Sequence, residues 1–247
     1  MDGADRATRD GSSASGADNN HRRRRFDYNI PVNWRRGVTM TIDAILFDAD
    51  GVIQRTRGDW REQFAAMLGR DGDVETFVKE LFAAERPCLS GAADFPTQLR
   101  VVLERWRSPT PVEQALQVWT NIEVHADVIE LIGSLRRGGM PVHLASNQQA
   151  HRARYMSAEL GYRALFDREF YSCRVGHAKP DTAYFEHILD ELKLPPERVL
   201  FIDDVEPNVA AARSVGIRSV HFAANAGAAA LDVHLAEHGV RRHRHAR

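Results

Sequence analysis

The chain has 247 residues, a hydrophobic fraction of 43% and a formal net charge of −1. This length suits one domain with an insertion or two small domains, and the hydrophobic fraction excludes a chain that is disordered throughout. No apolar run approaches the ~18 residues that a membrane-spanning helix needs, and Cys88 and Cys173 are too few for a disulfide framework. We therefore expect a cytoplasmic protein without a membrane partner.

The charge is distributed unevenly along the chain. Residues 1–40 carry a net charge of +3 and lack an apolar period, so they are expected to form a disordered N-terminal extension. Residues 231–247 are expected to form a basic C-terminal tail, since four arginines lie between 241 and 247. Residues 41–240 carry a net charge of −8, which argues against nucleic acid as the main partner.

The first ordered segment is a short apolar run, Ile42–Phe47, which ends at Asp48-Ala49-Asp50-Gly51. Apolar residues then recur at helical spacing, and no strand-like run interrupts them before residue 121. Residues 59–121 are therefore predicted to form a helical cap, inserted into an α/β core made by residues 41–58 and 122–230.

Helices and strands alternate after the cap, and a doubly wound parallel sheet of five strands follows from this rhythm. With the first run, the predicted strands are Pro141–Ala145, Glu169–Ser172, Val199–Ile202 and Arg218–Phe222. The predicted helices between them include His125–Arg137, residues 148–160, Asp181–Leu192 and Ala210–Ser214. The fold class is therefore α/β.

Polar side chains gather where these strands end, and ligands of such sheets bind at that edge. The residues are Asp48, Asp50, Ser146, Asn147, Asp203 and Asp204, with Lys179 in a loop. Each alone is better explained as a helix cap, but together they form a chemically matched set. Converging carboxylates repel one another unless a cation such as Mg²⁺ neutralises them, while hydroxyl and ammonium groups bind anions. The set predicts a magnesium site that faces a phosphate.

These segments resemble the four motifs of the haloacid dehalogenase-like hydrolases, in the family's order. The matching segments are Phe47-Asp48-Ala49-Asp50-Gly51-Val52, Leu144-Ala145-Ser146-Asn147, Ala178-Lys179-Pro180-Asp181 and Phe201-Ile202-Asp203-Asp204-Val205. The resemblance covers residues 41–225 and implies the Rossmann-like core fold of that family. The helical insert is similar to the cap of its small-molecule phosphatases, and Pro207-Asn208-Val209 is similar to sugar-phosphate phosphatases and to the phosphatase domain of soluble epoxide hydrolases.

The resemblance implies a magnesium-dependent phosphatase that hydrolyses a small phosphorylated metabolite, such as a sugar phosphate. Asp48 would attack phosphorus and form an aspartyl-phosphate, and Asp50 would protonate the leaving alcohol and then activate water. Ser146, Asn147 and Lys179 would hold the phosphoryl oxygens.

The resemblance also implies the ligands of the metal ion. Mg²⁺ would be held by Asp48, by the backbone carbonyl of Asp50 and by Asp204, with Asp203 in support. The family often has a further acid where this chain has Asn208, which leaves the division of roles between Asp203 and Asp204 open.

Alternative functions remain at this point. A dehalogenase has no need for an acid at Asp50, and a phosphomutase typically has a basic cap residue where Trp60 stands. A receiver-type signalling domain has its acidic pair after the first strand rather than the fourth. A non-catalytic protein that binds phosphorylated metabolites is the remaining alternative. Arg55 and Arg57 either contact the substrate's leaving group or lie in solvent, and the oligomeric state is not predicted.

Overall fold

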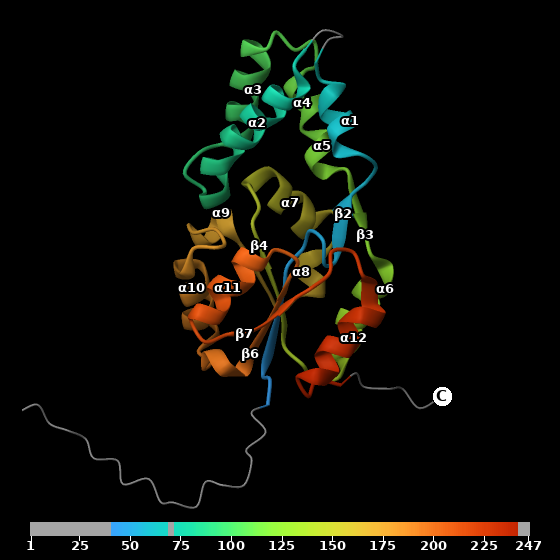
Figure 1. Ribbon diagram of the computed structural model, residues 1–247, viewed down its shortest axis with the longest axis vertical. Coiled ribbons are helices and arrows are strands. Elements are labelled where there is room, and N and C mark those ends of the chain that lie inside the picture. Colours follow the sequence, from blue (N-terminus) through green and yellow to red (C-terminus); the bar gives the residue numbers. More distant parts are fainter. Residues whose placement is uncertain (1–40, 69–71, 242–247) are drawn as a thin grey trace, which may run out of the picture. The chain divides into compact units, whose positions relative to one another are not determined.

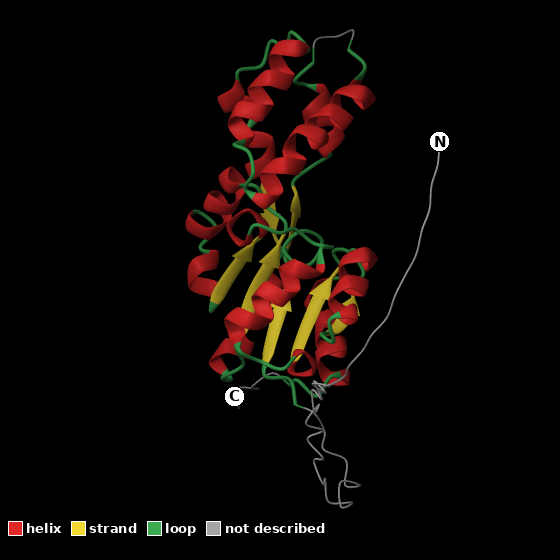
Figure 2. Cartoon of the chain, turned by 90° about the vertical axis from the view of Figure 1, so that its left-hand side faces the viewer, coloured by secondary structure: helices red, strands yellow, loops and turns green. Residues whose placement is uncertain are grey.

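The computed structural model describes residues 41–68 and 72–241 (Figures 1 and 2). The predicted extension at residues 1–40 and the last six residues of the predicted tail lie outside the described part. Within the described residues, no helix is both long and apolar enough to cross a membrane.

The centre of the core is a five-stranded parallel sheet, which confirms the predicted fold class. In chain order the strands are β1 (Ala44–Phe47), β4 (Val142–Ser146), β5 (Arg168–Tyr171), β6 (Val199–Asp203) and β7 (Arg218–His221). Their order across the sheet is β5-β4-β1-β6-β7. Phe47 lies opposite Leu144 on one side and Ile202 on the other, so β1, β4 and β6 end side by side.

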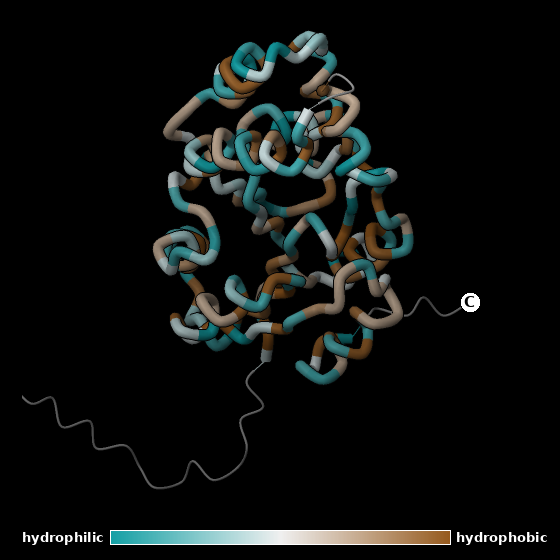
Figure 3. Tube along the Cα trace, turned by 45° about the horizontal axis from the view of Figure 1, so that its top comes forward, coloured by the Kyte–Doolittle hydropathy of each residue, from teal (hydrophilic) through white to brown (hydrophobic). Residues whose placement is uncertain are grey.

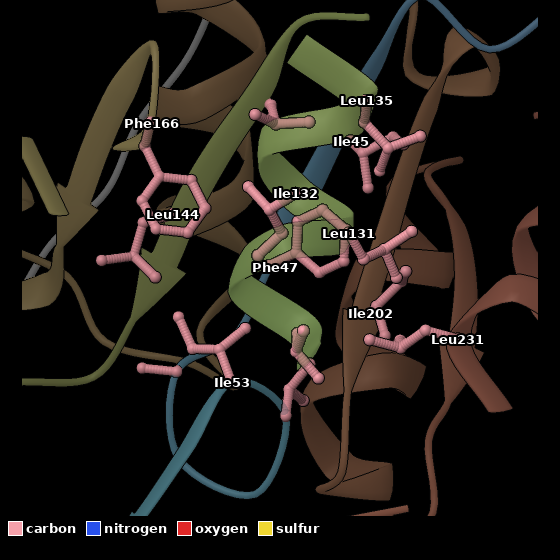
Figure 4. Close-up of a cluster of buried hydrophobic side chains, with 14 of the residues drawn as sticks. Ile45, Phe47, Ile53, Leu131, Ile132, Leu135, Leu144, Phe166, Ile202 and Leu231 are labelled. Carbon is pink, nitrogen blue, oxygen red and sulfur yellow. The ribbon is translucent and has the colours of Figure 1, made fainter. Parts of the chain in front are cut away.

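Alternating side chains of β1 pack on opposite faces of the sheet. Ile45 and Phe47 join Leu144 and Ile202 in one apolar cluster (Figure 4), whereas Leu46 belongs to the cluster on the other face. The helices that supply the first cluster are α6 (Ala126–Arg137), α7 (Ala150–Ala158), α8 (Tyr162–Leu165) and α12 (Gly227–Glu237). The other face is covered by α10 (Thr182–Leu192) and α11 (Glu206–Ser214). Short turns of helix, α9 (Ser172–Val175) and η2 (Pro196–Arg198), lie in connections.

The predicted start of the basic tail at residue 231 is wrong, because it falls inside α12. Leu231 and Leu235, one helical turn apart, are buried in the same cluster as β1, and Val240 is buried beyond them. The core therefore extends at least ten residues further than predicted, because these apolar residues cover a sheet face that would otherwise be exposed.

The cap has an apolar core of its own. Its helices are α1 (Trp60–Ala65), α2 (Val74–Glu85), η1 (Arg86–Ser90), α3 (Phe95–Arg105), α4 (Val112–Ala115) and α5 (Gln117–Thr120). Asp59, Asp73 and Asp94 cap the N-termini of α1, α2 and α3 with side-chain hydrogen bonds. Hydrophobic residues alternate with hydrophilic ones along these helices (Figure 3), and the former meet in a buried cluster that includes Trp119.

Two short strands join the cap to the core. β2 (Gln54–Thr56) and β3 (Ile122–Val124) pair as an antiparallel two-stranded sheet. These two strands were not predicted from the sequence, because three residues are too few to show a period of two. Both polypeptide crossings between cap and core therefore lie next to each other and are joined by hydrogen bonds.

Candidate active site

Three predicted carboxylates meet at the ends of β1 and β6. Asp48 directly follows β1, Asp203 is the last residue of β6 and Asp204 is the next. One carboxylate oxygen from each of the three residues lies within 4.8 Å of one carboxylate oxygen from each of the other two. The parallel register places them together, since β1 and β6 are neighbours that run in the same direction.

The Lys179 ammonium holds two of these carboxylates. Its Nζ donates to Asp48 Oδ1 at 2.8 Å, to Asp203 Oδ2 at 2.6 Å and to the backbone oxygen of Ala145 at 2.8 Å. Three acceptors satisfy all three of its N–H groups, and its side chain is almost completely buried. Lys179 therefore connects the ends of β1, β4 and β6.

Asp203 is fully engaged within the protein. Besides Lys179, it accepts hydrogen bonds from the backbone N–H of Val205 and from the Asn208 amide, which donates to both of its oxygens. Asn208 stands where the family often has an acid, and here it supplies a donor to Asp203. The side chain of Asp203 thus orients Lys179, and Asp204 is the less occupied of the two carboxylates.

The electrostatics of this cluster reflect an excess of negative charge. Burial raises the pKa of Asp48 to about 7; the Lys179 ammonium opposes that rise and the Asp203 carboxylate adds to it. Burial and the neighbouring Asp203 carboxylate also raise the pKa of Asp204. Burial alone would lower the pKa of Lys179, yet the two carboxylates outweigh it and raise that pKa. A further positive charge would stabilise all three carboxylates in their ionised form.

The donor set fits a divalent cation that prefers oxygen ligands. Three carboxylates against one ammonium leave two negative charges without a partner, and Mg²⁺ characteristically binds one or two carboxylates together with phosphate oxygens. Because Asp203 already accepts hydrogen bonds from Lys179, Val205 and Asn208, the side chains of Asp48 and Asp204 are the natural ligands. The residues present are therefore chemically suited to magnesium.

Gly51 lets the first motif approach the cluster closely. It has a φ of +79°, which glycine adopts without strain, and a Cβ atom there would lie 2.1 Å from Asp204 Oδ2. Only a residue without a side chain fits at this point.

The side chain of Asp50, in contrast, lies outside the three-carboxylate group. It accepts hydrogen bonds from Arg152 Nη1 at 2.6 Å and Nη2 at 2.8 Å, from Gln148 Nε2 at 2.8 Å and from Gln54 Nε2 at 3.0 Å. Burial would raise the pKa of Asp50, but the Arg152 guanidinium outweighs burial and holds that pKa below its ordinary value. Asp50 is thus an ionised carboxylate in a network of donors.

This network around Asp50 was not predicted from the sequence. Arg152 lies on α7, and in a chain that carries 33 basic residues, nearly all of them arginine, nothing in the sequence distinguished it. Its Nε also donates to the backbone oxygen of Trp119 in the cap at 2.8 Å. One guanidinium therefore joins Asp50 to the cap.

Ser146 is the last residue of β4 and Asn147 is the next, and their side chains have different contacts. Ser146 Oγ accepts a hydrogen bond from Gln148 Nε2 at 3.0 Å. The Asn147 amide donates to the backbone oxygen of Lys179 at 2.7 Å and accepts from the backbone N–H of Lys179 at 2.9 Å. Asn147 therefore positions the loop that carries Lys179.

These residues line one open cleft with a volume of about 750 Å³. Asp48, Asp50, Ser146, Asn147, Lys179 and Asp204 all border it, whereas Asp203 lies beneath its surface. Arg55 also borders the cleft, but its guanidinium forms a bidentate ion pair with Glu123 on β3. Arg57 does not border the cleft, so of the two arginines considered for leaving-group contact only Arg55 is placed near it.

The chain is similar in sequence to several curated proteins. A sesquiterpene phosphatase of Aspergillus oryzae is 33% identical over 100 residues, which cover 39% of this chain and 50% of that protein. A phosphorylated carbohydrates phosphatase of Thermotoga maritima is 23% identical over 186 residues, which cover 73% of this chain and 84% of that protein. The matches to the first three curated relatives cover 11%, 50% and 36% of their lengths.

Among solved structures, a haloacid dehalogenase-family enzyme of Bacteroides thetaiotaomicron in complex with magnesium and inorganic phosphate has the same fold. Its TM-score is 0.66 at 20% identity, and the match covers 77% of this chain and 98% of that one. The family model of the haloacid dehalogenase-like hydrolases matches residues 42–216, which include all four motifs of the cleft. The chain belongs to the family of haloacid dehalogenase-like hydrolases.

Proposed function

We propose that this hydrolase is a magnesium-dependent phosphatase that cleaves phosphomonoesters through an aspartyl-phosphate on Asp48. The observation that carries the proposal is the meeting of Asp48, Asp203 and Asp204 within 4.8 Å, with Lys179 bonded to two of them. Such a site binds a cation and an anion side by side, as phosphoryl transfer requires.

The side chains of the site support the covalent route. Asp48 borders the cleft, and its carboxylate is oriented by Lys179. An oxygen of Asp48 forms a bond to phosphorus as the bond between phosphorus and the ester oxygen breaks. The negative charge of the bound phosphate raises the pKa of Asp50 against the effect of Arg152, and the protonated Asp50 gives its proton to the departing alkoxide. The positive charge of Lys179 offsets the charge that develops on the phosphoryl group, and the Ser146 hydroxyl donates to a phosphoryl oxygen during the transfer.

Hydrolysis of the aspartyl-phosphate completes the reaction. Asp50 takes a proton from a water molecule as the water attacks phosphorus, so that inorganic phosphate leaves and the Asp48 carboxylate is restored. Arg152 favours the carboxylate form of Asp50, which this second step requires. When bound, Mg²⁺ supplies positive charge that offsets the charge on the phosphoryl oxygens.

The relatives support phosphatase chemistry over the alternatives. Two of them are phosphatases by name, one for sesquiterpenes and one for phosphorylated carbohydrates. The acid at Asp50 supports phosphoryl transfer over dehalogenation, because attack on carbon needs no proton for the leaving group. Trp60, which borders the cleft, stands where a phosphomutase typically has a basic residue.

The test is release of inorganic phosphate from p-nitrophenyl phosphate and from alkyl phosphates, with and without Mg²⁺. We expect turnover by the wild-type chain with Mg²⁺, and none by Asp48→Asn, whose amide is a poor nucleophile. Asp181→Asn is the matched control, because this aspartate caps α10 from an exposed position next to Pro180. Full turnover by Asp48→Asn would contradict the proposal.

A further inference from the structure

A second pocket, with a volume of about 310 Å³, opens beside the catalytic cleft. It shares Thr56, Trp60, Asn147 and Arg152 with the cleft, so the two are continuous. A phosphomonoester whose phosphate lies against Asp48 therefore has room for its alcohol part between the core and the cap. The proposed function needs such a space, and the chemistry of its walls indicates which alcohols fit.

The cap wall of this pocket is apolar and largely aromatic. Its apolar residues are Trp60, Phe64, Phe82, Leu89, Val118 and Trp119. The ring of Trp60 lies 5.7 Å from those of Phe64 and Phe82, and Phe64 lies 5.0 Å from Trp119, measured between centroids. Phe82 is 44% exposed, although it packs against this group. A large side chain left partly in water at a pocket wall is available to an apolar ligand.

Two of the described residues that line the pocket carry ionisable side chains, Arg152 and Glu85. Arg152 donates to both oxygens of Asp50, to Gln148 and to the backbone of Trp119. Among the described residues that line the pocket, Glu85 is the one charged side chain from the cap. Burial raises the pKa of Glu85 to about 7, so that a large share of it is uncharged at neutral pH.

We propose that this pocket binds the alcohol part of the substrate and selects a hydrocarbon chain or ring, an inference that rests on the proposed phosphatase function. The substrate class is then the phosphomonoesters of apolar alcohols. A sugar would bring several hydroxyl groups into this space, where the apolar side chains of the cap would leave most of them without hydrogen-bond partners. Pockets built to bind hydroxyls discriminate through polar groups, and here six of the seven cap-side residues from Trp60 to Trp119 are apolar, with Glu85 the exception.

The test is the dependence of kcat/KM on chain length for ethyl, butyl, hexyl and octyl phosphate, measured with the full chain and Mg²⁺. The leaving alcohols have closely similar basicity, so the series reports binding of the chain rather than chemistry. We expect kcat/KM to rise by about threefold per methylene group until the pocket is full. Hexyl phosphate is expected to exceed glucose 6-phosphate by at least about tenfold.

Phe82→Ser tests the wall itself. It should reduce the octyl-to-ethyl ratio of kcat/KM by about tenfold, because it removes apolar area from the pocket. Val101→Ser is the matched control, since Val101 is 47% exposed on α3 of the same cap and does not line the pocket, and it should leave the ratio unchanged.

Two outcomes overturn the inference in distinguishable ways. If ethyl phosphate is hydrolysed but the series is flat, or if Phe82→Ser lowers all members equally, the pocket does not select apolar alcohols and the phosphatase function stands. If neither the alkyl phosphates nor p-nitrophenyl phosphate is hydrolysed, the proposed function fails and this inference fails with it.

Discussion

The carboxylate of Asp50 accepts two hydrogen bonds from the guanidinium of Arg152, at 2.6 and 2.8 Å, across 102 residues of sequence. The same guanidinium donates to the backbone of Trp119 in the cap. The proposed acid and base is therefore held by a residue that also contacts the cap. Arg152 acts through Asp50, as a positioning residue.

Replacement of Arg152 should shift the pH dependence of the reaction. Asp50 must be protonated to donate to a leaving alkoxide, so activity toward alkyl phosphates should fall as pH rises through the pKa of Asp50. Arg152 lowers that pKa, and Arg152→Gln should raise it and move the alkaline limb of the kcat profile, which reports the substrate-bound enzyme, to higher pH. Profiles for butyl phosphate measure this shift.

The control for this variant is Arg154→Gln, which removes the same charge from an exposed position on α7. It should leave the profile in place. A substrate that needs little protonation, p-nitrophenyl phosphate, should show a smaller shift in Arg152→Gln than butyl phosphate does. Equal shifts for both substrates would contradict the role of Asp50 as the acid.

Gly51→Ala should abolish activity, because its Cβ would lie 2.1 Å from Asp204 Oδ2. Gly139→Ala is a matched control: Gly139 has a φ of +84°, close to the +79° of Gly51, but has no neighbouring atom within 4 Å of its Cβ position. The control should lose about 1–2 kcal/mol of unfolding free energy from backbone strain and retain activity. Thermal unfolding and phosphate release distinguish the two effects, and an active Gly51→Ala protein would show that the close approach is not required.

His143 should make the folded state sensitive to acid. Its side chain is buried on β4 next to Phe170, and its Nδ1 has no hydrogen-bond partner. Burial lowers the pKa of His143 from 6.5 to about 4, so the unfolded chain takes up a proton at a higher pH than the folded one does. The contribution of neutral His143 to the free energy of unfolding is fully present above pH 6.5. As pH falls toward 4, the free energy of unfolding decreases by up to about 3 kcal/mol through this group.

The measurement is the difference in unfolding free energy between His143→Leu and the wild-type chain at pH 7 and pH 4.5. Other groups titrate equally in the variant and in the wild-type chain, so this difference isolates His143. As pH falls, the free energy of unfolding of the variant should increase relative to that of the wild-type chain. His187→Leu is the control, because this side chain is exposed and should stay in solvent in both states. A pH-independent difference for His143→Leu would contradict the prediction.

The sequence predicted the sheet and its strand ends well, because each strand is a short buried run followed by a polar residue with its own chemistry. Asp48, Ser146 and Asp203 could be found for that reason. Arg152 and Phe82 could not, because their importance depends on how α7 and the cap helices face the cleft, which periodicity does not determine. The α12 helix was missed because its two buried leucines precede an arginine-rich end that suggested a tail.

The proposed mechanism depends on an aspartyl-phosphate on Asp48, which mass spectrometry of acid-quenched protein detects directly. The Asp50→Asn variant should be used with p-nitrophenyl phosphate and Mg²⁺, since it can accept the phosphoryl group from an activated ester but should stall in its hydrolysis. We predict the added mass of one phosphoryl group on the peptide that contains Asp48, and its absence in the Asp48→Asn/Asp50→Asn double variant or after chelation of Mg²⁺. Rapid phosphate release by Asp50→Asn with no modified Asp48 peptide would contradict a covalent intermediate on Asp48.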